Sequence, residues 1–433
     1  MERPNILYIH SHDSGRYVEP YGHAIPTPNI RALAERGTLF RQAFCGGPTC
    51  SPSRACLVTG SWAHSNGMLG LAHRGFKLRD YGQHLVNHIR GAGYISTLIG
   101  IQHIHRDPGV IGFDRIIDAE SNRAEHVIPA AVEHLKSGPE QPFFLSVGTS
   151  ETHRAYHEPG PTEDPGYTMP PAPIPDTPET RADMASFKAS ARIFDEGVGR
   201  VLDALEESGM AENTLVICTT DHGIAFPHMK CKLYEGGIGV MLIMSGPGGF
   251  GGGRVIDSLV SQIDIYPTIC DLLELDVPGW VQGRSMMPLI RGEVDEINEQ
   301  IFAEVTYHAA YEPQRAVRTR RWKYIRRFGD RDRPVLCNVD NSPSKTVWMD
   351  HGWGDRDVAR EELFDLVFDP NEAHNLAGDP SHLDVLEDMR NRLDTWMRST
   401  DDPLLKGPVP APSGAVITLP DEVNPRGKME KIP

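Results

Sequence analysis

Short apolar runs alternate with stretches of helical periodicity over roughly the first 300 residues of the chain. Strands are predicted at residues 6–9, 95–99, 143–147, 215–219, 240–244 and 301–304. Helices are predicted at residues 28–36, 81–91 and 180–207, and the first of these opens on a proline, which favours that position. Such alternation is typical of a mostly parallel sheet flanked by helices on both faces, so we expect an α/β fold.

The pattern changes after residue 311. Short strand candidates separated by charged turns follow at residues 316–317, 322–325 and 335–336, and a helix is predicted at 382–397. They indicate a smaller C-terminal domain with an antiparallel sheet. Residues 401–433 hold many prolines and no clear periodicity, so we expect an extended arm. The predicted parts are a large domain (1–311), a smaller α+β domain (312–400) and the arm (401–433).

Two irregular segments interrupt the large domain. Residues 155–178 are rich in proline and are expected to form an ordered loop over a site. The glycine-rich residues 246–253 lack the Gly-Lys-Ser/Thr ending of a phosphate-binding loop and open no predicted helix. We interpret them as a turn between strands.

Composition and charge narrow the class of protein. The chain has 433 residues, of which 39% are hydrophobic and 24% charged, as in ordinary soluble globular proteins. Its 43 Lys and Arg residues against 59 Asp and Glu residues give a net charge of −16, which argues against nucleic acid as a partner. No apolar run is long enough to span a membrane, and the N-terminus lacks the apolar region of a signal peptide.

The number and spacing of the cysteines indicate the cellular compartment of the protein. There are seven of them, an odd number, and none forms a Cys-x-x-Cys pair. This usage is typical of reduced intracellular proteins in which cysteines act as small buried hydrophobes. We therefore expect a cytoplasmic protein, or a periplasmic or secreted one if the sequence has been trimmed.

One segment carries most of the functional information. Residues 50–60 read Cys-Ser-Pro-Ser-Arg-Ala-Cys-Leu-Val-Thr-Gly. On its own this predicts a turn leading into a helix, with Cys50 buried and inert. It also resembles, without a mismatch, the signature of type I sulfatases, which is Cys-x-Pro-Ser-Arg followed by Leu-x-Thr-Gly. The resemblance extends over nearly the whole chain and implies the alkaline-phosphatase-like sulfatase fold.

The resemblance implies a nucleophile derived from Cys50. In the family this cysteine is oxidised by a separate formylglycine-generating maturation enzyme. The hydrated aldehyde attacks sulfur, and the resulting sulfated hemiacetal collapses by losing sulfate, so that one difficult displacement becomes two easier steps. A helix N-terminus would add backbone N–H groups and a dipole that favour the anionic sulfate. Arg54, one turn further on, would hold the aldehyde hydrate or its charge.

Two further segments offer ligands for a metal. Residues 11–14 (Ser-His-Asp-Ser) and 221–223 (Asp-His-Gly) each follow a predicted strand. Open α/β sheets place their sites at such strand ends, although either segment alone could be a helix cap or a turn. Given the resemblance, they match the metal positions of the family. The expected ligands are Asp13, Asp221, His222 and the Cys50 position, with His12 left open.

The predicted metal ligands depart from the usual sulfatase pattern. The family commonly has Asp-Asp and Asp-Asn where this chain has His12-Asp13 and Asp221-His222. The resemblance to the family favours Ca²⁺, whereas imidazole ligands favour Mn²⁺, Zn²⁺ or Fe²⁺. The Asp-His pair also resembles phosphonate monoester hydrolases and phosphodiesterases of the same superfamily.

The resemblance assigns further residues of the site. Residues 100–103 (Gly-Ile-Gln-His) resemble the Gly-Lys-x-His segment of the family with isoleucine in place of lysine, and His103 would serve as the base that breaks down the hemiacetal. His153 would protonate or stabilise the leaving group. Lys230 matches a sulfate-binding lysine. The alternative for each is an ordinary hydrogen-bonded or solvated side chain. Contacts to the rest of the substrate are expected from His64, His308, Arg154 and the 155–178 loop.

Within the family, the chain looks most like the heparan N-sulfatases (sulfamidases). The segments that carry this likeness are residues 64–68, 182–184, 195–199 and 223–227. The expected function is hydrolysis of a sulfate ester or sulfamate on a small sulfated substrate, which we expect to be a saccharide. The protein is expected to be a homo-oligomer without a membrane partner. The alternatives are a phosphonate monoester hydrolase or phosphodiesterase, and a sulfated-glycan-binding protein with unmodified Cys50. The basic residues 315–333 could line an entrance for an anionic saccharide or form a solvated strand face.

Overall fold

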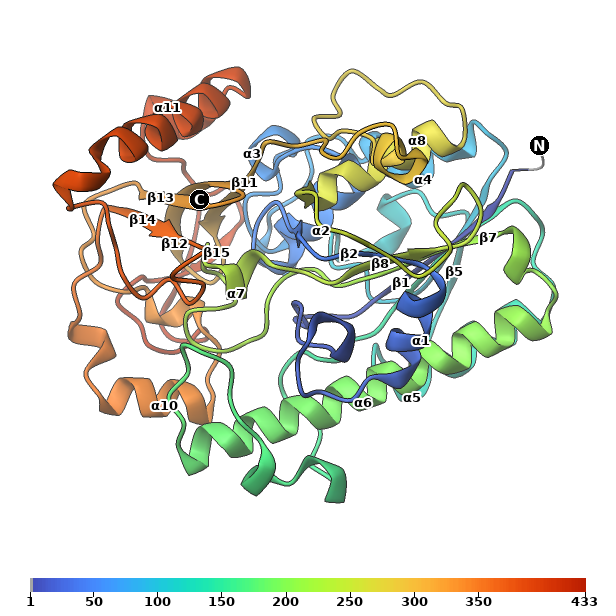
Figure 1. Cartoon of the computed structure of the whole chain (residues 1–433), viewed down its shortest axis with the longest axis horizontal. Helices are drawn as coiled ribbons and strands as arrows, with labels where there is room; N and C mark the ends of the chain where they lie inside the picture. The colour runs from blue at the N-terminus through green and yellow to red at the C-terminus, as the bar shows by residue number, and fades with distance from the viewer. Residues whose placement is uncertain (1–2) are drawn as a thin grey trace.

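The computed structural model describes residues 3–433, which form a large and a small sheet with helices packed around them (Figure 1). The large sheet has eight strands in the order β5-β4-β6-β1-β7-β8-β2-β9. Its strands are β1 (Asn5–His10), β2 (Thr38–Phe40), β4 (Ile95–Gly100), β5 (Arg115–Ile117), β6 (Phe143–Gly148), β7 (Thr214–Thr219), β8 (Leu242–Ser245) and β9 (Arg254–Ile256). Only β8 runs antiparallel to its neighbours, β7 and β2, so the predicted mostly parallel sheet is confirmed.

Helices cover both faces of the large sheet. The helices α1 (Pro28–Arg36), α5 (Ala124–Lys136) and α6 (Pro178–Glu207) lie on one face, the lower one in Figure 1. The other face carries α2 (Cys50–Thr59), α4 (Leu85–Arg90) and α8 (Ile265–Leu272). Each layer buries its apolar side chains against the sheet in a separate core cluster. Shorter elements are α3 (Ala63–Asn66), α7 (Glu235–Ile238), α9 (Met287–Arg291) and the parallel pair β3 (Ala43–Phe44) and β10 (Val260–Ser261).

The C-terminal part forms a four-stranded antiparallel sheet. Its strands, in spatial order, are β11 (Gln300–Tyr307), β12 (Tyr311–Thr319), β13 (Trp322–Arg327) and β14 (Glu361–Asp365). The helices α10 (Pro343–Asp350) and α11 (Leu383–Ser399) accompany it. The terminal arm adds a hairpin of β15 (Val416–Thr418) and β16 (Met429–Lys431), which the sequence did not indicate.

The strand predicted at 301–304 joins the small sheet as β11, not the large one. A domain boundary after residue 311 therefore falls inside the β11–β12 hairpin, because a short apolar run does not show which sheet it enters. The strand predicted at 335–336 is wrong, since a 3₁₀ turn occupies Leu336–Asn338. The helix predicted at 81–91 is divided at His84, whose backbone is extended, into a 3₁₀ turn and α4.

Other predictions of local structure hold. Helix α1 has the predicted bounds, and α6 and α11 differ from theirs by two residues or fewer. Residues 246–253 connect β8 to β9, as expected for a turn. The 155–178 loop contains two 3₁₀ turns, Pro161–Glu163 and Pro165–Tyr167.

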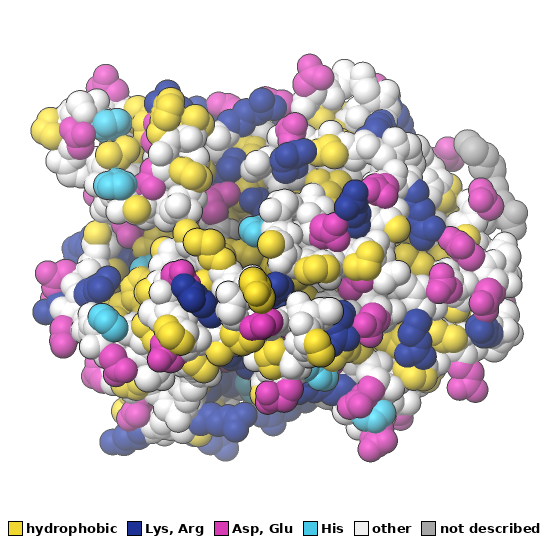
Figure 2. Space-filling view, turned by 60° about the horizontal axis from the view of Figure 1, so that its bottom comes forward, with side chains coloured by type: hydrophobic (Ala, Val, Ile, Leu, Met, Phe, Trp, Pro, Cys, Tyr) yellow, Lys and Arg dark blue, Asp and Glu magenta, His cyan; other side chains and the backbone are white. Residues whose placement is uncertain are grey.

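The surface mixes charges of both signs. Figure 2 shows acidic and basic side chains interspersed over one face, with hydrophobic side chains gathered near its middle. The net charge of −16 is therefore not concentrated in one field on this face. Among residues 3–433, none of the helices combines the length and apolar character that crossing a bilayer requires.

Candidate active and metal site

Four neighbouring strands of the large sheet bring the predicted site residues together. The strands β4, β6, β1 and β7 are adjacent in this order and parallel. Their carboxyl ends are level, because His10 of β1 pairs with Gly148 of β6 and Thr219 of β7. The segments that follow these four strands carry, in the same order, His103, His153, the His12-Asp13 pair and the Asp221-His222 pair. Segments far apart in the sequence therefore meet at one edge of the sheet, as open α/β folds favour.

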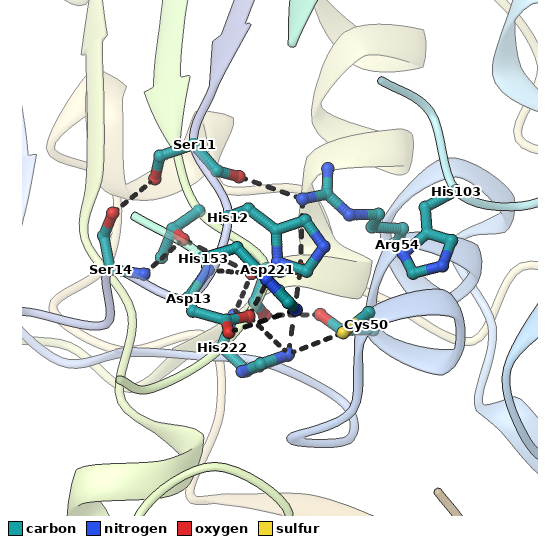
Figure 3. A network of polar contacts seen from close by, with 12 residues as sticks. Ser11, His12, Asp13, Ser14, Cys50, Arg54, His103, His153, Asp221 and His222 are labelled. Carbon is teal, nitrogen blue, oxygen red and sulfur yellow. Dashed lines mark hydrogen bonds and ion pairs between the residues drawn. The ribbon is translucent and has the colours of Figure 1, made fainter. Parts of the chain in front are cut away.

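Four of these side chains form a compact buried cluster with Cys50 (Figure 3). One ligand atom from each of His12, Asp13, Cys50, Asp221 and His222 lies within 4.8 Å of the others, and all five residues are buried. Carboxylate, imidazole and thiol groups are ligands for divalent metals. His12, whose role the sequence left open, points its Nδ1 atom at Asp13 Oδ1 (2.7 Å) and Asp221 Oδ2 (3.3 Å) and so belongs to this cluster.

Backbone contacts hold the two acidic loops against each other. The backbone N–H of Asp13 donates to Asp221 Oδ1 at 2.8 Å. Asp13 itself lies in the left-handed region with φ of 61°, which a residue other than glycine adopts at a cost. The Oδ2 atom of Asp221 is buried and accepts no hydrogen bond among the described residues, although His12 and Arg54 lie near it. An oxygen held in this way fits a metal ligand.

Cys50 is the first residue of α2, as expected from the sequence. Its sulfur lies 3.4 Å from His222 Nε2. The Nδ1 atom of His222 lies 2.9 Å from the carbonyl oxygen of Gly223, which can only accept, so Nδ1 carries the proton and Nε2 faces the cluster with a free electron pair. Burial raises the pKa of the Cys50 thiol well above its usual range, so the thiol is protonated at neutral pH.

Arg54 lies one turn along the same helix and faces the cluster. Its Nη2 atom lies 3.0 Å from Asp221 Oδ2 and donates to the carbonyl oxygen of Ser11 at 2.9 Å. Its Nη1 atom lies 2.7 Å from His10 Nδ1. These partners fix the guanidinium beside Cys50 and the metal ligands (Figure 3).

Lys230 is buried between two carboxylates. Its Nζ atom lies 2.8 Å from Asp13 Oδ2 and 3.0 Å from Asp340 Oδ2. Burial disfavours the ammonium, but Asp13 and Asp340 more than offset it, and the pKa of Lys230 lies well above its usual range. Burial likewise opposes ionisation of Asp13, but Lys230 together with the neighbouring histidines outweighs it, so the pKa of Asp13 is well below its usual range. The lysine is thus a fixed cation beside the cluster.

His153 and His103 flank the cluster. The Nε2 atom of His153 lies 3.9 Å from Asp13 Oδ2, and its side chain is 35% exposed, so the imidazole faces both the cluster and solvent. The ring of His103 lies 5.6 Å from that of His12, and its Nε2 atom is 3.0 Å from His73 Nδ1. Burial, followed by the neighbouring His12, lowers the pKa of His103 well below its usual range.

Two of the three predicted substrate contacts border the cluster region. His308 is buried, its Nδ1 atom has no hydrogen-bond partner within residues 3–433, and burial followed by Lys230 lowers its pKa. Arg154 lines a cavity next to His153, but Asp183 holds its guanidinium through two hydrogen bonds of 2.6 and 2.8 Å. Arg154 therefore shapes the cavity wall with a charge that is already paired.

The structure places His64 elsewhere. Its imidazole is fully buried, its Nδ1 atom lies 2.9 Å from Glu304 Oε1, and its ring packs 5.2 Å from that of Trp396. A substrate contact by His64 is therefore corrected to a structural role beneath the small sheet.

The basic residues 315–333 are divided between the interior and the surface, because Arg320 and Arg321 are exposed whereas Arg315 and Lys323 are not. Arg315 and Lys323 are fully buried, and both pair with carboxylates. Arg315 lies 2.5 Å from Asp402, and Lys323 lies 2.8 Å from Glu235. The sequence could not reveal this burial, because charged and apolar residues alternate in the same way whether the charged face of a strand is solvated or buried in ion pairs.

Two groups near the site escaped the sequence-based reasoning. Asp340 follows the 3₁₀ turn at Leu336–Asn338 and reaches Lys230 across more than 100 residues of sequence. Residues 424–426 of the arm line the cavity beside His153. Neither group has a motif or a periodic neighbourhood, so only the tertiary fold identifies them.

Comparison with known proteins agrees with this geometry. The family model described as Sulfatase matches residues 4–275, and the model described as N-sulphoglucosamine sulphohydrolase, C-terminal, matches residues 225–352. The human N-sulphoglucosamine sulphohydrolase is 31% identical over 93% of this chain and 92% of its own length.

Solved structures share the fold. One is a protein in complex with its substrate D-glucosamine-2-N,6-O-disulfate, with a TM-score of 0.72 and 18% identity over 94% of this chain and 99% of that one. Another is a phosphonate monoester hydrolase from Silicibacter pomeroyi, with a TM-score of 0.73 and 21% identity over 93% of this chain and 97% of that one. The architecture is therefore common to proteins that act on different substrates.

Proposed function

This chain belongs to the sulfatase family and is a sulfuric ester hydrolase, and from this we propose that it removes sulfate from a saccharide bearing a sulfate ester or a sulfamate. Glucosamine N-sulfate is the first candidate. Its support is the 31% identity to the human N-sulphoglucosamine sulphohydrolase over 93% of this chain, together with the match of residues 225–352. The observation that carries the proposal is the buried cluster of Cys50 with four metal-ligand side chains.

Cys50 is proposed to act after oxidation to formylglycine. A buried thiol whose pKa is well above its usual range is a poor nucleophile at neutral pH, so the unmodified side chain does not suit the role. A formylglycine at this position would supply a hydrated aldehyde oxygen as nucleophile. The proposal requires a formylglycine-generating maturation enzyme as a partner.

A divalent metal is proposed to occupy the cluster. Asp13, Asp221, His222 and His12 would hold it together with the residue formed from Cys50. The buried Oδ2 atom of Asp221, which accepts no hydrogen bond among the described residues, and the unprotonated Nε2 atom of His222 fit such a group. The metal would supply positive charge for the sulfate oxygens. The imidazoles support Mn²⁺, whereas family habit supports Ca²⁺.

The surrounding side chains divide the remaining tasks. Arg54 beside Asp221 and Lys230 beside Asp13 are fixed cations, suited to the sulfate oxygens as negative charge builds up on them. His153, which lines the cavity and whose side chain is 35% exposed, is proposed to give a proton to the departing group. His103, on the Arg54 side in Figure 3, is the candidate base for the release of sulfate.

The test is a substrate panel on the intact protein. Glucosamine N-sulfate, glucosamine 6-sulfate, an aryl sulfate and an aryl phosphonate are compared with Mn²⁺ and with Ca²⁺, and released sulfate or phenol is measured. We expect sulfate release, fastest from the N-sulfated sugar. Faster turnover of the aryl phosphonate would favour the phosphonate hydrolase alternative, which the Asp221-His222 pair motivates. Binding of sulfated sugars without any turnover would favour the glycan-binding alternative.

Two expectations from the sequence stay predictions. They are a reducing, cytoplasmic location and a homo-oligomeric state. All seven cysteines are buried, as predicted for small hydrophobes. Sedimentation of the purified protein measures its oligomeric state.

A further inference from the structure

A cavity of about 640 Å³ opens beside the catalytic cluster. His153 and Asp340 form its inner end, because His153 approaches Asp13 and Asp340 contacts Lys230. Arg154 lines its wall, and residues 424–426 of the C-terminal arm form its rim. The cavity is thus built by the large domain, the small domain and the arm together.

The permanently charged side chains that line this cavity are paired with opposite charges of the protein, with one exception. Arg154 is paired with Asp183, and Asp340 is paired with Lys230. Arg426, which is exposed, has no ion pair and no side-chain hydrogen bond among residues 3–433. Among the described residues that line the cavity, Arg426 is therefore the one permanent cation without an opposite charge paired to it.

The turn that carries Arg426 is held at both sides by buried or half-buried cations. Arg74 donates from Nη2 to the carbonyl oxygen of Pro425 at 2.7 Å and from Nη1 to Thr418 Oγ1 at 3.0 Å. Lys345 donates to the carbonyl oxygen of Val423 at 2.7 Å. The backbone N–H of Arg426 donates to Asn424 Oδ1 at 2.8 Å. A surface arm without a task needs no such anchoring, because loose termini are ordinarily tolerated.

We propose that Arg426 is a specificity residue that binds a second anionic group of the substrate, a sulfate or a carboxylate, while the sulfate to be removed lies at the metal cluster. This inference rests on the proposed function. A planar guanidinium suits both anions, because its N–H groups match two oxygens at once. The protein would therefore prefer saccharides that carry two anionic groups over those that carry one.

The test compares three substrates that share the same scissile group. They are glucosamine N-sulfate, glucosamine N,6-O-disulfate, and an N-sulfated glucosamine linked to a uronic acid. KM and kcat are measured for the parent protein, Arg426→Gln and Arg426→Lys. We expect Arg426→Gln to raise KM about tenfold for a substrate with a second anion and to leave glucosamine N-sulfate unchanged. Arg426→Lys should lose less, since it keeps the charge.

The matched control is Lys428→Gln, which removes an exposed cation from the same arm outside the lining of the cavity. It should leave all three substrates unchanged. A response of the disulfated substrate alone identifies the second anion as sulfate, and a response of the uronate-containing substrate alone identifies it as a carboxylate. Equal effects on all three substrates, or no effect on any, overturn the inference.

A binding measurement separates this inference from the proposed function. The three saccharides are titrated calorimetrically into Cys50→Ala protein with and without Arg426→Gln. If the parent releases sulfate from none of them, the proposed function fails, yet a loss of affinity confined to the saccharides with two anions still supports the role of Arg426. Identical dissociation constants with and without the guanidinium, or no binding at all, overturn it.

Discussion

His222 directs its Nε2 atom at the sulfur of Cys50 from 3.4 Å, because its Nδ1 proton is engaged by the carbonyl oxygen of Gly223. Cys50 begins α2, whereas His222 follows the central strand β7, so the contact joins a helix N-terminus to a strand end. One of these residues is the candidate nucleophile and the other is a candidate metal ligand. Replacing either residue of this pair therefore tests the proposed nucleophile or the proposed metal site.

Replacing Cys50 by alanine should abolish turnover without unfolding the protein. Because the thiol is the precursor of the proposed nucleophile, we expect a loss in kcat of roughly 10³-fold or more. Mass spectrometry of the peptide containing Cys50 should show an aldehyde in place of the thiol in active parent protein. An unmodified thiol in fully active enzyme would contradict the mechanism.

Cys56 provides the control on the same helix. It is buried like Cys50 but lies outside the metal cluster, in an apolar core beneath the small sheet. Cys56→Ala should therefore keep kcat and KM within about twofold, at a small cost in thermal stability. Loss of turnover in both variants would point to damaged folding instead of a lost nucleophile.

His222→Asn exchanges an imidazole for an amide oxygen and tests the identity of the metal. We expect the Mn²⁺ concentration for half-maximal activity to rise by about tenfold or more, while Ca²⁺ becomes relatively more effective, because amide oxygen suits Ca²⁺. The measurement is reactivation of chelator-treated protein by each metal. His126→Asn, a replacement on α5 outside the cluster, should change neither curve. If Ca²⁺ alone reactivates the parent, the preference for Mn²⁺ is refuted.

The sequence predicted the clustering of the candidate ligand residues far better than it predicted their surroundings. The residues at the ends of β1 and β7 could be placed together because parallel strands end at one edge of a sheet, and the structure brings them within 4.8 Å. Even the starting position of α2 follows from the signature around Cys50.

What could not be predicted depends on contacts between distant segments. Asp340 reaches Lys230 from a segment without regular periodicity, and Arg426 is positioned by Arg74 through backbone carbonyls. His64 was misplaced for a related reason, since nothing local reveals that Glu304 lies 2.9 Å from it. Local propensity carries no information on such pairings.

His153→Gln should slow poor leaving groups more than good ones. If His153 donates the proton to the departing group, we expect kcat on a sulfated sugar to fall by about 10²–10⁴-fold, and kcat on 4-nitrophenyl sulfate, whose phenolate leaves readily, to fall much less. The measurement is kcat across aryl and alkyl sulfates of graded leaving-group pKa. His157→Gln is the neighbouring control, since that imidazole contacts Glu151 at 3.0 Å instead of the cluster. Equal losses for all leaving groups would assign His153 to binding.

A buried ionic network joins segments that lie far apart in the chain. Glu304 of β11 lies 2.9 Å from His64 and 3.2 Å from Arg315, and Arg315 reaches Asp402 in the arm. Burial opposes ionisation of Glu304, but His64 and Arg315 outweigh it and lower the pKa of its carboxyl to about 2. The ionised form is therefore favoured in the folded protein more than in the unfolded chain.

Glu304→Gln should lower the free energy of unfolding at pH 7 by about 3 kcal/mol, because it leaves His64 and Arg315 without one carboxylate in a buried site. The stabilisation is fully present above the ordinary carboxyl pKa of 4.5 and is lost as pH falls toward about 2, so the variant should lose less stability than the parent over this interval. Urea unfolding between pH 7 and pH 3 measures both effects. Glu299→Gln, which breaks an exposed pair with Arg392, should cost less than about 1 kcal/mol. Parallel stability curves for parent and Glu304→Gln would show that the network does not favour the ionised carboxylate.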